Sequence, residues 1–348
     1  MTPRLKRRNT GLLLLFFVLT SCFLLRKNNG SKTSHSANNK AAGGLGHDKL
    51  ALYRQTVKAE MMRVRMGKPC MLNRPWYHIR LGSQWEGGRN YGDDLNLDLA
   101  AALLGIQRNQ VKTTTDRTLA GKIMGIGSVL THTCIGDIVL GTGLSFASKD
   151  ARPESQVWKN LNDTLTKILS VRGSDTRMRI MEQNVDCPAE YGDLGVTASL
   201  LIWPDLYPSS TPPHDVCVVP HATDSTLKKE AAEHRPMVQV LSISPAKPVD
   251  LTKSMMDCKL IISSSLHVLM IADAYGIPTR WYHGPDSNQV DKYNDYYRGV
   301  GTDRSSDYAT TLVDAINMGP MEPALSLEKM LNVTMRLLQF FPFDIVCE

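Results

Sequence analysis

The chain has 348 residues and a formal net charge of +6, and its 42% hydrophobic and 21% charged content is ordinary for a globular protein. This composition excludes collagen-like, coiled-coil and wholly disordered chains. Residues 1–40 contain eight Lys or Arg and no acidic residue, which leaves a net charge of −2 for the remainder. The part expected to fold therefore has no basic surplus, and we expect no nucleic-acid partner.

An apolar run at residues 11–25 follows a basic cluster and is closed by Arg26 and Lys27. Its length is that of a signal-peptide core, but no A-x-A cleavage site follows it, so we expect an uncleaved signal anchor. A cleaved signal peptide is the alternative. The excess of cations before the run predicts a cytosolic tail at residues 1–10. The segment after the run, residues 26–67, is expected to be a stem.

A short tail, one membrane span and a stem form the layout of Golgi glycan-modifying enzymes. We therefore expect a type II Golgi membrane glycoprotein with a lumenal catalytic part. Three N-x-[ST] triplets, at Asn29, Asn162 and Asn332, are glycosylation candidates. Six of the seven cysteines would be lumenal, where disulfides form, and the sequence does not select their pairing. Buried free thiols are the alternative.

From residue 68 onward, short apolar runs that end in Gly or Ser alternate with helical stretches, a pattern typical of α/β folds with parallel strands. We predict strands near residues 77–81, 122–126, 137–140, 167–171, 215–219, 237–243 and 259–262. We predict helices at residues 94–104, 175–183, 196–203, 226–234, 266–275, 307–317 and 326–340. A Pro-rich stretch at 203–213 predicts the boundary between two Rossmann-like lobes, 68–203 and 204–348, with a cleft between them.

The most informative local pattern is a predicted strand that runs into three serines and then into a helix, within residues 259–278. Ser264 and Ser265 lie at the helix start, where free backbone N–H groups and small side chains bind phosphate or carboxylate. His267, in the first helical turn, could donate a proton to an anion bound there. A core histidine is the alternative, because apolar residues follow at helical spacing.

Two further patterns place charged residues at predicted strand-to-helix turns. Arg172 is suited to a bidentate grip on carboxylate or phosphate, and the alternative is a surface arginine that pairs with Asp175. Asp93 could act as a base or orient a sugar hydroxyl, and the alternative is an Asp favoured by the helix dipole. No Walker loop, H-E-x-x-H or D-x-D motif occurs, so we predict no metal and no bound cofactor.

Together and in this order, these segments resemble the polysaccharide pyruvyltransferase family. The matching segments are NYGDDLN (90–96), GIGSVL (125–130), GTG (141–143), VRGSDTR (171–177), YGD (191–193), VVPH (218–221) and SSSLHVLMIADAYGIP (263–278). A later KYNDYY (292–297) resembles a Lys-x-x-Asp-Tyr element of some bacterial members. The resemblance spans roughly residues 75–300, and Val268 stands where the family usually has Gly after the Leu-His pair.

The resemblance implies a GT-B-like fold of two Rossmann-like lobes. It implies transfer of pyruvate from phosphoenolpyruvate, as co-substrate, to two hydroxyls of a hexose in a glycan or polysaccharide, forming a cyclic ketal. It assigns Arg172 and Arg280 to the donor's anionic groups and His267 to proton donation. Asp93 would orient or deprotonate the acceptor, and His221 is a secondary substrate-binding candidate.

Two alternatives remain open at the level of the sequence. A nucleotide-sugar-dependent Golgi glycosyltransferase with the same two-lobed fold would use the helix start at Ser265 to hold a diphosphate. A non-catalytic glycan-binding protein of the same fold would bind the glycan without turning over a donor.

Overall fold

The computed structural model describes residues 41–65, 74–77, 91–145, 152–244, 247–285 and 290–343. Internal contacts divide the chain into residues 1–49 and residues 50–348, and the second unit contains both β-sheets. None of the described helices is long and apolar enough to cross a membrane. The expected tail at 1–10, the expected anchor at 11–25 and the triplet at Asn29 lie outside the described residues.

A helix occupies the second half of the expected stem. It is α2 (Ala41–Val64), and it places Tyr53, Val57 and Met61 in the main hydrophobic cluster. Their spacing of four residues puts them on one helical face. The side chain of Arg54 donates to the backbone carbonyl of Ser199 at 2.8 Å. The polar stretch that predicts a stem ends before Tyr53. The apolar residues from Tyr53 onward recur at helical spacing, which explains why this part forms a packed helix.

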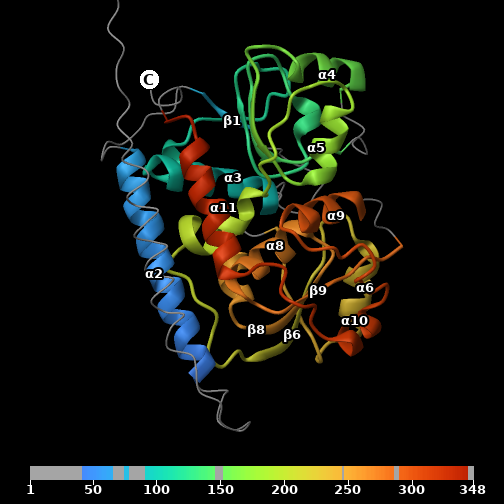
Figure 1. The fold of residues 1–348 in the computed structure, drawn as a ribbon. Coiled ribbons are helices and arrows are strands. Elements are labelled where there is room, and N and C mark those ends of the chain that lie inside the picture. Colours follow the sequence, from blue (N-terminus) through green and yellow to red (C-terminus); the bar gives the residue numbers. More distant parts are fainter. Residues whose placement is uncertain are drawn as a thin grey trace, which may run out of the picture. The chain divides into compact units, whose positions relative to one another are not determined.

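The first sheet has five parallel strands in the order β2-β1-β3-β4-β5 (Figure 1). The strands are β1 (Trp76–Tyr77), β2 (Thr113–Thr114), β3 (Ile123–Met124), β4 (Ile138–Thr142) and β5 (Lys167–Val171). Helices α3 (Tyr91–Leu104), α4 (Glu154–Leu161) and α5 (Ser174–Met181) belong to this half. The parallel α/β prediction is therefore confirmed here.

The second sheet has four parallel strands in the order β7-β6-β8-β9. The strands are β6 (His214–Val219), β7 (Gln239–Val240), β8 (Cys258–Ser263) and β9 (Thr279–Trp281). The helices of this half are α6 (Ser225–Glu233), α7 (Pro248–Met255), α8 (Leu266–Tyr275), α9 (Val290–Gly299) and α10 (Leu312–Met318). The repetition of strand, helix and parallel strand gives each half a Rossmann-like organisation.

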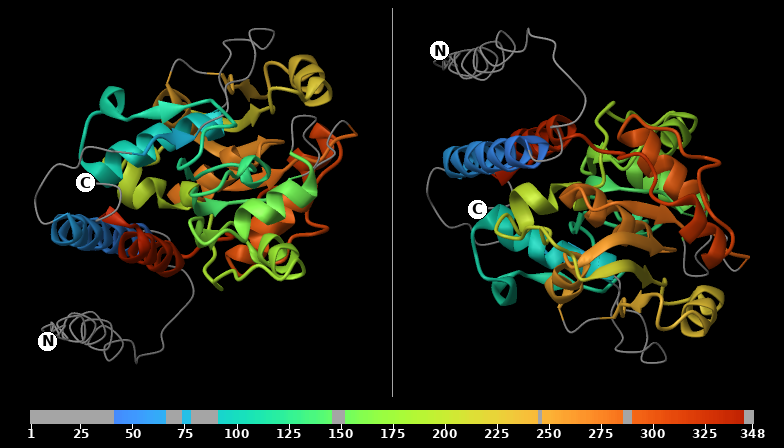
Figure 2. Two further views of the ribbon diagram at one scale, coloured as in Figure 1. Left: turned by 90° about the horizontal axis from the view of Figure 1, so that it is seen from above. Right: turned by 90° about the horizontal axis from the view of Figure 1, so that it is seen from below.

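The two halves share one continuous hydrophobic core. The main cluster contains Leu95 and Leu99 of α3 together with Ile261 of β8 and Leu269 of α8. Near the junction of the halves lie the short helical turns η4 (Leu194–Thr197) and η5 (Ala198–Ile202), and helix α11 (Leu327–Phe340) contacts both turns (Figure 2). The predicted helix at 196–203 is thus a pair of irregular turns. The apolar core continues across the Pro-rich stretch that predicts a boundary.

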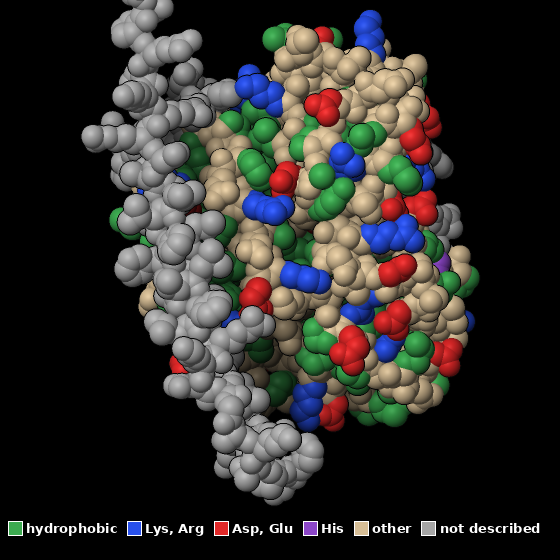
Figure 3. Space-filling model, viewed as in Figure 1, with side chains coloured by type: hydrophobic (Ala, Val, Ile, Leu, Met, Phe, Trp, Pro, Cys, Tyr) green, Lys and Arg blue, Asp and Glu red, His purple; other side chains and the backbone are tan. Residues whose placement is uncertain are grey.

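Charged side chains of both signs are interspersed on the face drawn in Figure 3. Lys259 and Asp215 form one exposed ion pair, with 2.6 Å between Nζ and Oδ1. Exposed pairs of this kind contribute little to stability. The stability of the fold therefore depends on its shared apolar core rather than on its surface charges.

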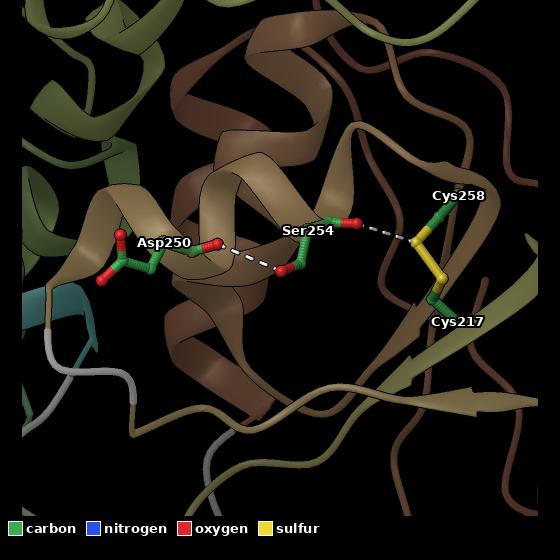
Figure 4. Close-up of a disulfide and its surroundings, with 4 residues drawn as sticks. All are labelled: Cys217, Asp250, Ser254 and Cys258. Carbon is green, nitrogen blue, oxygen red and sulfur yellow. Dashed lines mark hydrogen bonds between the residues drawn. A yellow bond between two sulfur atoms is a disulfide. The ribbon is translucent and has the colours of Figure 1, made fainter. Parts of the chain in front are cut away.

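A disulfide joins the two central strands of the second sheet. Cys217 of β6 is bonded to Cys258 of β8, with their Cα atoms 5.8 Å apart (Figure 4). Cys134 and Cys187 are buried free thiols. The described residues therefore contain both a disulfide and buried free thiols, the two outcomes expected for the cysteines.

We expect the Cys217→Ala/Cys258→Ala variant to lose about 2–4 kcal/mol of unfolding free energy, because the crosslink restricts the unfolded chain. The crosslinked residues are 41 positions apart in the sequence. Urea denaturation of the oxidised protein measures the loss. Cys134→Ala removes a buried sulfur without a crosslink and is the matched control. Equal losses in the two variants would show that the disulfide itself stabilises nothing.

Candidate functional site

The candidate site lies where the strand order reverses in each sheet. The reversal falls between β1 and β3 in the first sheet and between β6 and β8 in the second. Open parallel sheets bind ligands at the carboxyl ends of the strands beside such a reversal. Asp93 lies just after the start of α3, and Ser264 directly follows β8. The sequence-predicted residues therefore lie where the topology favours a ligand.

The two reversal points meet at Gly92 and His267. A side chain on Gly92, at the start of α3, would overlap the imidazole ring of His267, at the start of α8. A side chain on Gly143, directly after β4, would likewise overlap the guanidinium group of Arg172. Glycine at these two positions lets the backbone approach the side chains of His267 and Arg172 closely.

Arg172 is held rigidly and keeps one donor free. It directly follows β5, and its side chain is 1% exposed. Its Nε donates to Oδ2 of Asp295 at 3.1 Å, and its Nη1 donates to Oγ of Ser128 at 2.7 Å. Its Nη2 is buried and has no hydrogen-bond partner among the described residues. The guanidinium group thus presents one fixed nitrogen whose N–H groups have no partner among the described residues, which favours an anion there.

Asp295 on α9 fixes Arg172 and α5 at once. Its Oδ1 accepts a hydrogen bond from the backbone N–H of Thr176 at 2.9 Å, and its Oδ2 accepts one from the Thr176 hydroxyl at 2.7 Å. Asp175 instead pairs with Arg298 at 2.8 Å, so the alternative pairing of Arg172 with Asp175 is wrong. Charge-assisted bonds of this kind hold both partners in one geometry.

The ring of His267 is neutral at physiological pH. Its Nε2 is shielded from solvent and has no hydrogen-bond partner among the described residues. Burial lowers the pKa of His267 to about 3, and the nearby cations Lys292 and Arg172 and the ring of His221 act in the same direction. A core histidine would be expected to satisfy both ring nitrogens, so the free Nε2 favours a functional role.

Two buried carboxyl groups face these cations. Burial, together with the nearby Asp94 and Asp193, raises the pKa of Asp93 to about 8, and Lys292 opposes this rise. Burial also raises the pKa of Asp193 to about 7, against the influence of Arg172. The Oδ2 atom of Asp193 is buried without a hydrogen-bond partner among the described residues. With a pKa of about 8, Asp93 carries a proton at neutral pH.

Lys292 on α9 completes the cluster. Its side chain is half-buried, and burial together with Arg172 lowers its pKa to about 8, while Asp93 opposes this. Lys292 influences the titration of Asp93 and of His267 alike. It therefore lies close enough to both for their charges to be coupled.

The serines connect the strand ends rather than standing free. The backbone N–H of His221 donates to Oγ of Ser264 at 3.0 Å, and the hydroxyl of Tyr293 donates to the Ser264 carbonyl at 2.7 Å. Ser265 is the N-cap residue of α8, but its side chain makes no capping hydrogen bond. The backbone N–H of Leu266, the first residue of α8, is bonded to the Tyr293 hydroxyl. The next N–H groups, of His267 and Val268, are those that a helix start leaves for an anion.

The structure brings Asp93, Arg172 and His267 together, with His221, Ser264 and Ser265 at the ends of the adjoining strands. Arg280 is not part of this group. It lies on β9 in register with Ile262, and its guanidinium donates to the Gly319 carbonyl at 2.7 Å and to Asp307 at 2.6 Å. Arg280 is the middle residue of β9 rather than its end, and its donors are directed to structural partners. Its predicted contact with a donor therefore has no geometric support.

Sequence reasoning assigned no role to four residues that contribute to the cluster, and these are Ser128, Asp193, Lys292 and Asp295. All four lie in the segments on which the resemblance stated from the sequence is based, so the signal was present.

Three other expectations from the sequence concern residues outside the cluster. Val268 is fully buried in the main hydrophobic cluster. Asn162 and Asn332 are exposed, which is compatible with glycosylation. The described residues contain no group of three or more His, Cys, Asp or Glu placed to hold a metal ion.

Comparisons with known proteins name no activity. No family model matches the chain. A segment of 201 residues, or 56% of the chain, is 26% identical to an uncharacterised protein of Acanthamoeba polyphaga mimivirus and covers 66% of that protein. The chain thus spans just under two thirds of the length of that relative. A solved structure of a functionally uncharacterised protein from Klebsiella pneumoniae is 14% identical, with a TM-score of 0.41 over 73% of this chain and 97% of that one.

We expect Gly92→Ala to destabilise the protein by about 1–3 kcal/mol, because the new methyl group overlaps the His267 ring. Urea denaturation of Gly92→Ala, His267→Ala and the double variant measures the coupling. The double variant is expected to be more stable than the sum of the single effects predicts, since removing the ring makes room for the methyl group. Additive effects would contradict the close approach of the two helix starts.

We expect Asp93→Asn to reduce the loss of stability between pH 6.5 and 8. Asp93 titrates near pH 4 in the unfolded chain, about four units below its pKa in the folded protein. Between these two values the unfolded chain has lost the proton that the folded protein keeps, so the free energy of unfolding falls as the pH rises towards 8. The lowered pKa values of His267 and His221 act oppositely, but only below about pH 6.5, and that of Lys292 acts oppositely only above about pH 8.

The measurement is the free energy of unfolding at several pH values. The wild type should lose up to about 1.4 kcal/mol per pH unit for each buried carboxyl group in this window, and Asp93→Asn should remove one such contribution. Asp116→Asn is the control, because Asp116 is exposed. Equal slopes in the wild type and in Asp93→Asn would contradict the raised pKa of Asp93.

Proposed function

We propose that the protein transfers pyruvate from phosphoenolpyruvate to a hexose of a glycan or polysaccharide and forms a cyclic ketal. The observation that carries the proposal is that Nη2 of Arg172 and Nε2 of His267 are both buried without a hydrogen-bond partner among the described residues, with Arg172 close enough to lower the pKa of His267. A buried charged donor without a partner is costly, so the arrangement favours a bound anion. Phosphoenolpyruvate supplies a carboxylate and a phosphate on one small molecule.

The donor's two anionic groups match two separate donor sets. Arg172 offers its Nη2 and Lys292 offers a second cation, while α8 offers the N–H groups of its first turn after Leu266. Planar guanidinium suits a carboxylate or a phosphate, and a helix start suits a phosphate. This division also supports the finer proposal of a GT-B-like arrangement, with the donor between two Rossmann-like halves.

The reaction needs a proton at the methylene carbon of the donor. Protonation makes C2 electrophilic, and one sugar hydroxyl adds to it and gives up its proton to a nearby base. Phosphate then leaves with its bonding electron pair. A second hydroxyl of the same sugar then closes the ring, and its proton leaves with the phosphate or with a nearby base. The products are the ketal and one inorganic phosphate, so atoms balance without an oxidant or a metal-bound group.

His267 and Asp93 divide the proton transfers between them. The low pKa of His267 results from burial and from nearby positive charge. A bound anionic donor offsets the charges of Arg172 and Lys292, which raises the pKa of His267 and lets the ring carry the required proton. Asp93 orients the acceptor hydroxyl and exchanges its proton, since its pKa of about 8 lies near physiological pH.

The proposed setting is the lumen of the Golgi, with the chain anchored by residues 11–25. The apolar run, the basic residues that precede it and the glycosylation triplets support this proposal. The disulfide between Cys217 and Cys258 supports an oxidising compartment.

We expect the full-length protein, purified in detergent, to release phosphate from phosphoenolpyruvate when it is given β-galactosides or other hexosides, and to increase the glycan mass by one ketal. His267→Ala should lower kcat at least about a hundredfold, because general acid catalysis is lost. Arg172→Lys should raise KM for phosphoenolpyruvate at least about tenfold, because lysine cannot reproduce the planar fork.

Arg298→Lys is the matched control, since Arg298 is an exposed arginine on α9 that pairs with Asp175. It should leave both parameters near those of the wild type. A folded wild-type protein without turnover and without a thermal shift on adding phosphoenolpyruvate would exclude the proposal. A shift with a nucleoside diphosphate instead would favour the glycosyltransferase alternative.

A further inference from the structure

A second feature of the C-terminal half is a cavity of about 510 Å³ beside the loop that carries His221. Its walls come from this loop, from α6 and the turn after it, and from β7 with the segment that continues it. Lys228 and Arg235 supply two cations and Ser242 and Ser244 two hydroxyl groups, and the other lining residues are apolar. The volume is within the range of small-molecule sites.

The cavity has an uncompensated positive charge. Among the described residues that line it, none carries a carboxylate. The nearby acidic side chains of Asp224 and Glu230 do not line the cavity, and they accept hydrogen bonds from backbone N–H groups. Asp224 accepts from the backbone N–H of Leu227 at 2.9 Å, and Glu230 accepts from the backbone N–H of Leu312 at 2.6 Å. An anionic group of a ligand would therefore meet two cations and no competing carboxylate.

Positive charge continues from this cavity to the candidate site. Nζ of Lys228 donates to the carbonyl of Ala222 at 2.7 Å, directly beside His221. Burial lowers the pKa of His221 to about 3, and both Lys292 and Lys228 act in the same direction. His221 is also tied to the start of α8 through its backbone bond to Ser264. A ligand in the cavity would thus lie next to the proposed donor position.

We propose that this cavity binds an acidic saccharide acceptor, with its sulfate or carboxylate group between Lys228 and Arg235. This inference rests on the proposed function, because the acceptor must reach the donor beside His267. The apolar lining from Val240, Leu241 and Ile243 suits the C–H face of a sugar ring, and the two serines suit its hydroxyls. The described residues of the lining include no aromatic ring for a nucleobase to stack on, which favours a saccharide over a nucleotide.

The test is isothermal titration of the full-length protein, without phosphoenolpyruvate, with lactose 3′-sulfate, 3′-sialyllactose, neutral lactose, inorganic sulfate and uridine diphosphate as separate probes. We expect the acidic saccharides to bind at least tenfold more tightly than lactose or sulfate. The Lys228→Gln/Arg235→Gln variant should weaken them at least tenfold. Lys229→Gln is the matched control, because Lys229 is the next residue of α6 and lines a different cavity.

Equal binding of lactose and its sulfated form, no binding of any saccharide, or no effect of the double variant would overturn the inference. Tight binding of uridine diphosphate that depends on Lys228 and Arg235 would overturn it in favour of a nucleotide. A thermal shift with phosphoenolpyruvate alone reports on the donor site. Acidic saccharide binding without that shift would count against the proposed function and leave the cavity assignment standing, whereas the reverse pattern would remove only the cavity assignment.

Discussion

The arrangement of the candidate site depends on the ion pair between Arg172 and Asp295. Arg172 follows the last strand of the first sheet, and Asp295 lies on α9 of the other half, so this one buried contact connects the two halves. Side chains at Gly173 and Gly299 would overlap backbone atoms of Asp295 and Arg172, so the chain segments themselves are in close contact. A residue larger than glycine at either position would separate the pair.

A buried ion pair costs desolvation energy that its attraction only partly offsets. The shared hydrophobic core, which includes residues of α3 and α8, offsets the remainder, and it also fixes the distance between the helix starts that carry Asp93 and His267. The pair leaves Nη2 of Arg172 unsatisfied. The fold thus stabilises a geometry that would be unfavourable by itself, which is typical of sites prepared for a ligand.

The sequence predicts the long, regular elements well and the short ones poorly. The strand expected at 167–171 is β5 itself. The helix expected at 266–275 is α8 itself, which begins after Ser265 and ends before Gly276. The two-residue strand β2 has no detectable periodicity. Helix α9 was missed because its run of Asn, Asp and Tyr has low intrinsic helix propensity, although Tyr293, Tyr296 and Tyr297 are its buried face.

The site is predictable only as far as local sequence reports on distant contacts. A helix start with serines is visible locally, so His267 and Ser265 could be inferred. The face on which Arg280 lies is set by strand register, and the contact between Arg172 and Asp295 spans more than a hundred residues. Such pairings follow from topology, which a local pattern does not contain.

The charges of the clustered side chains favour an anionic ligand. Arg172 and Lys292 lower the pKa of His267, and Lys292 and Lys228 lower that of His221, so cations here disfavour further positive charge. Asp93 holds a proton near neutral pH and contributes little negative charge. A neutral ligand would leave this repulsion in place, whereas an anion relieves it and raises the basicity of His267. Ligand charge and the proton affinity of His267 are therefore coupled, and in the proposed reaction the anionic donor would itself prepare the ring for proton transfer.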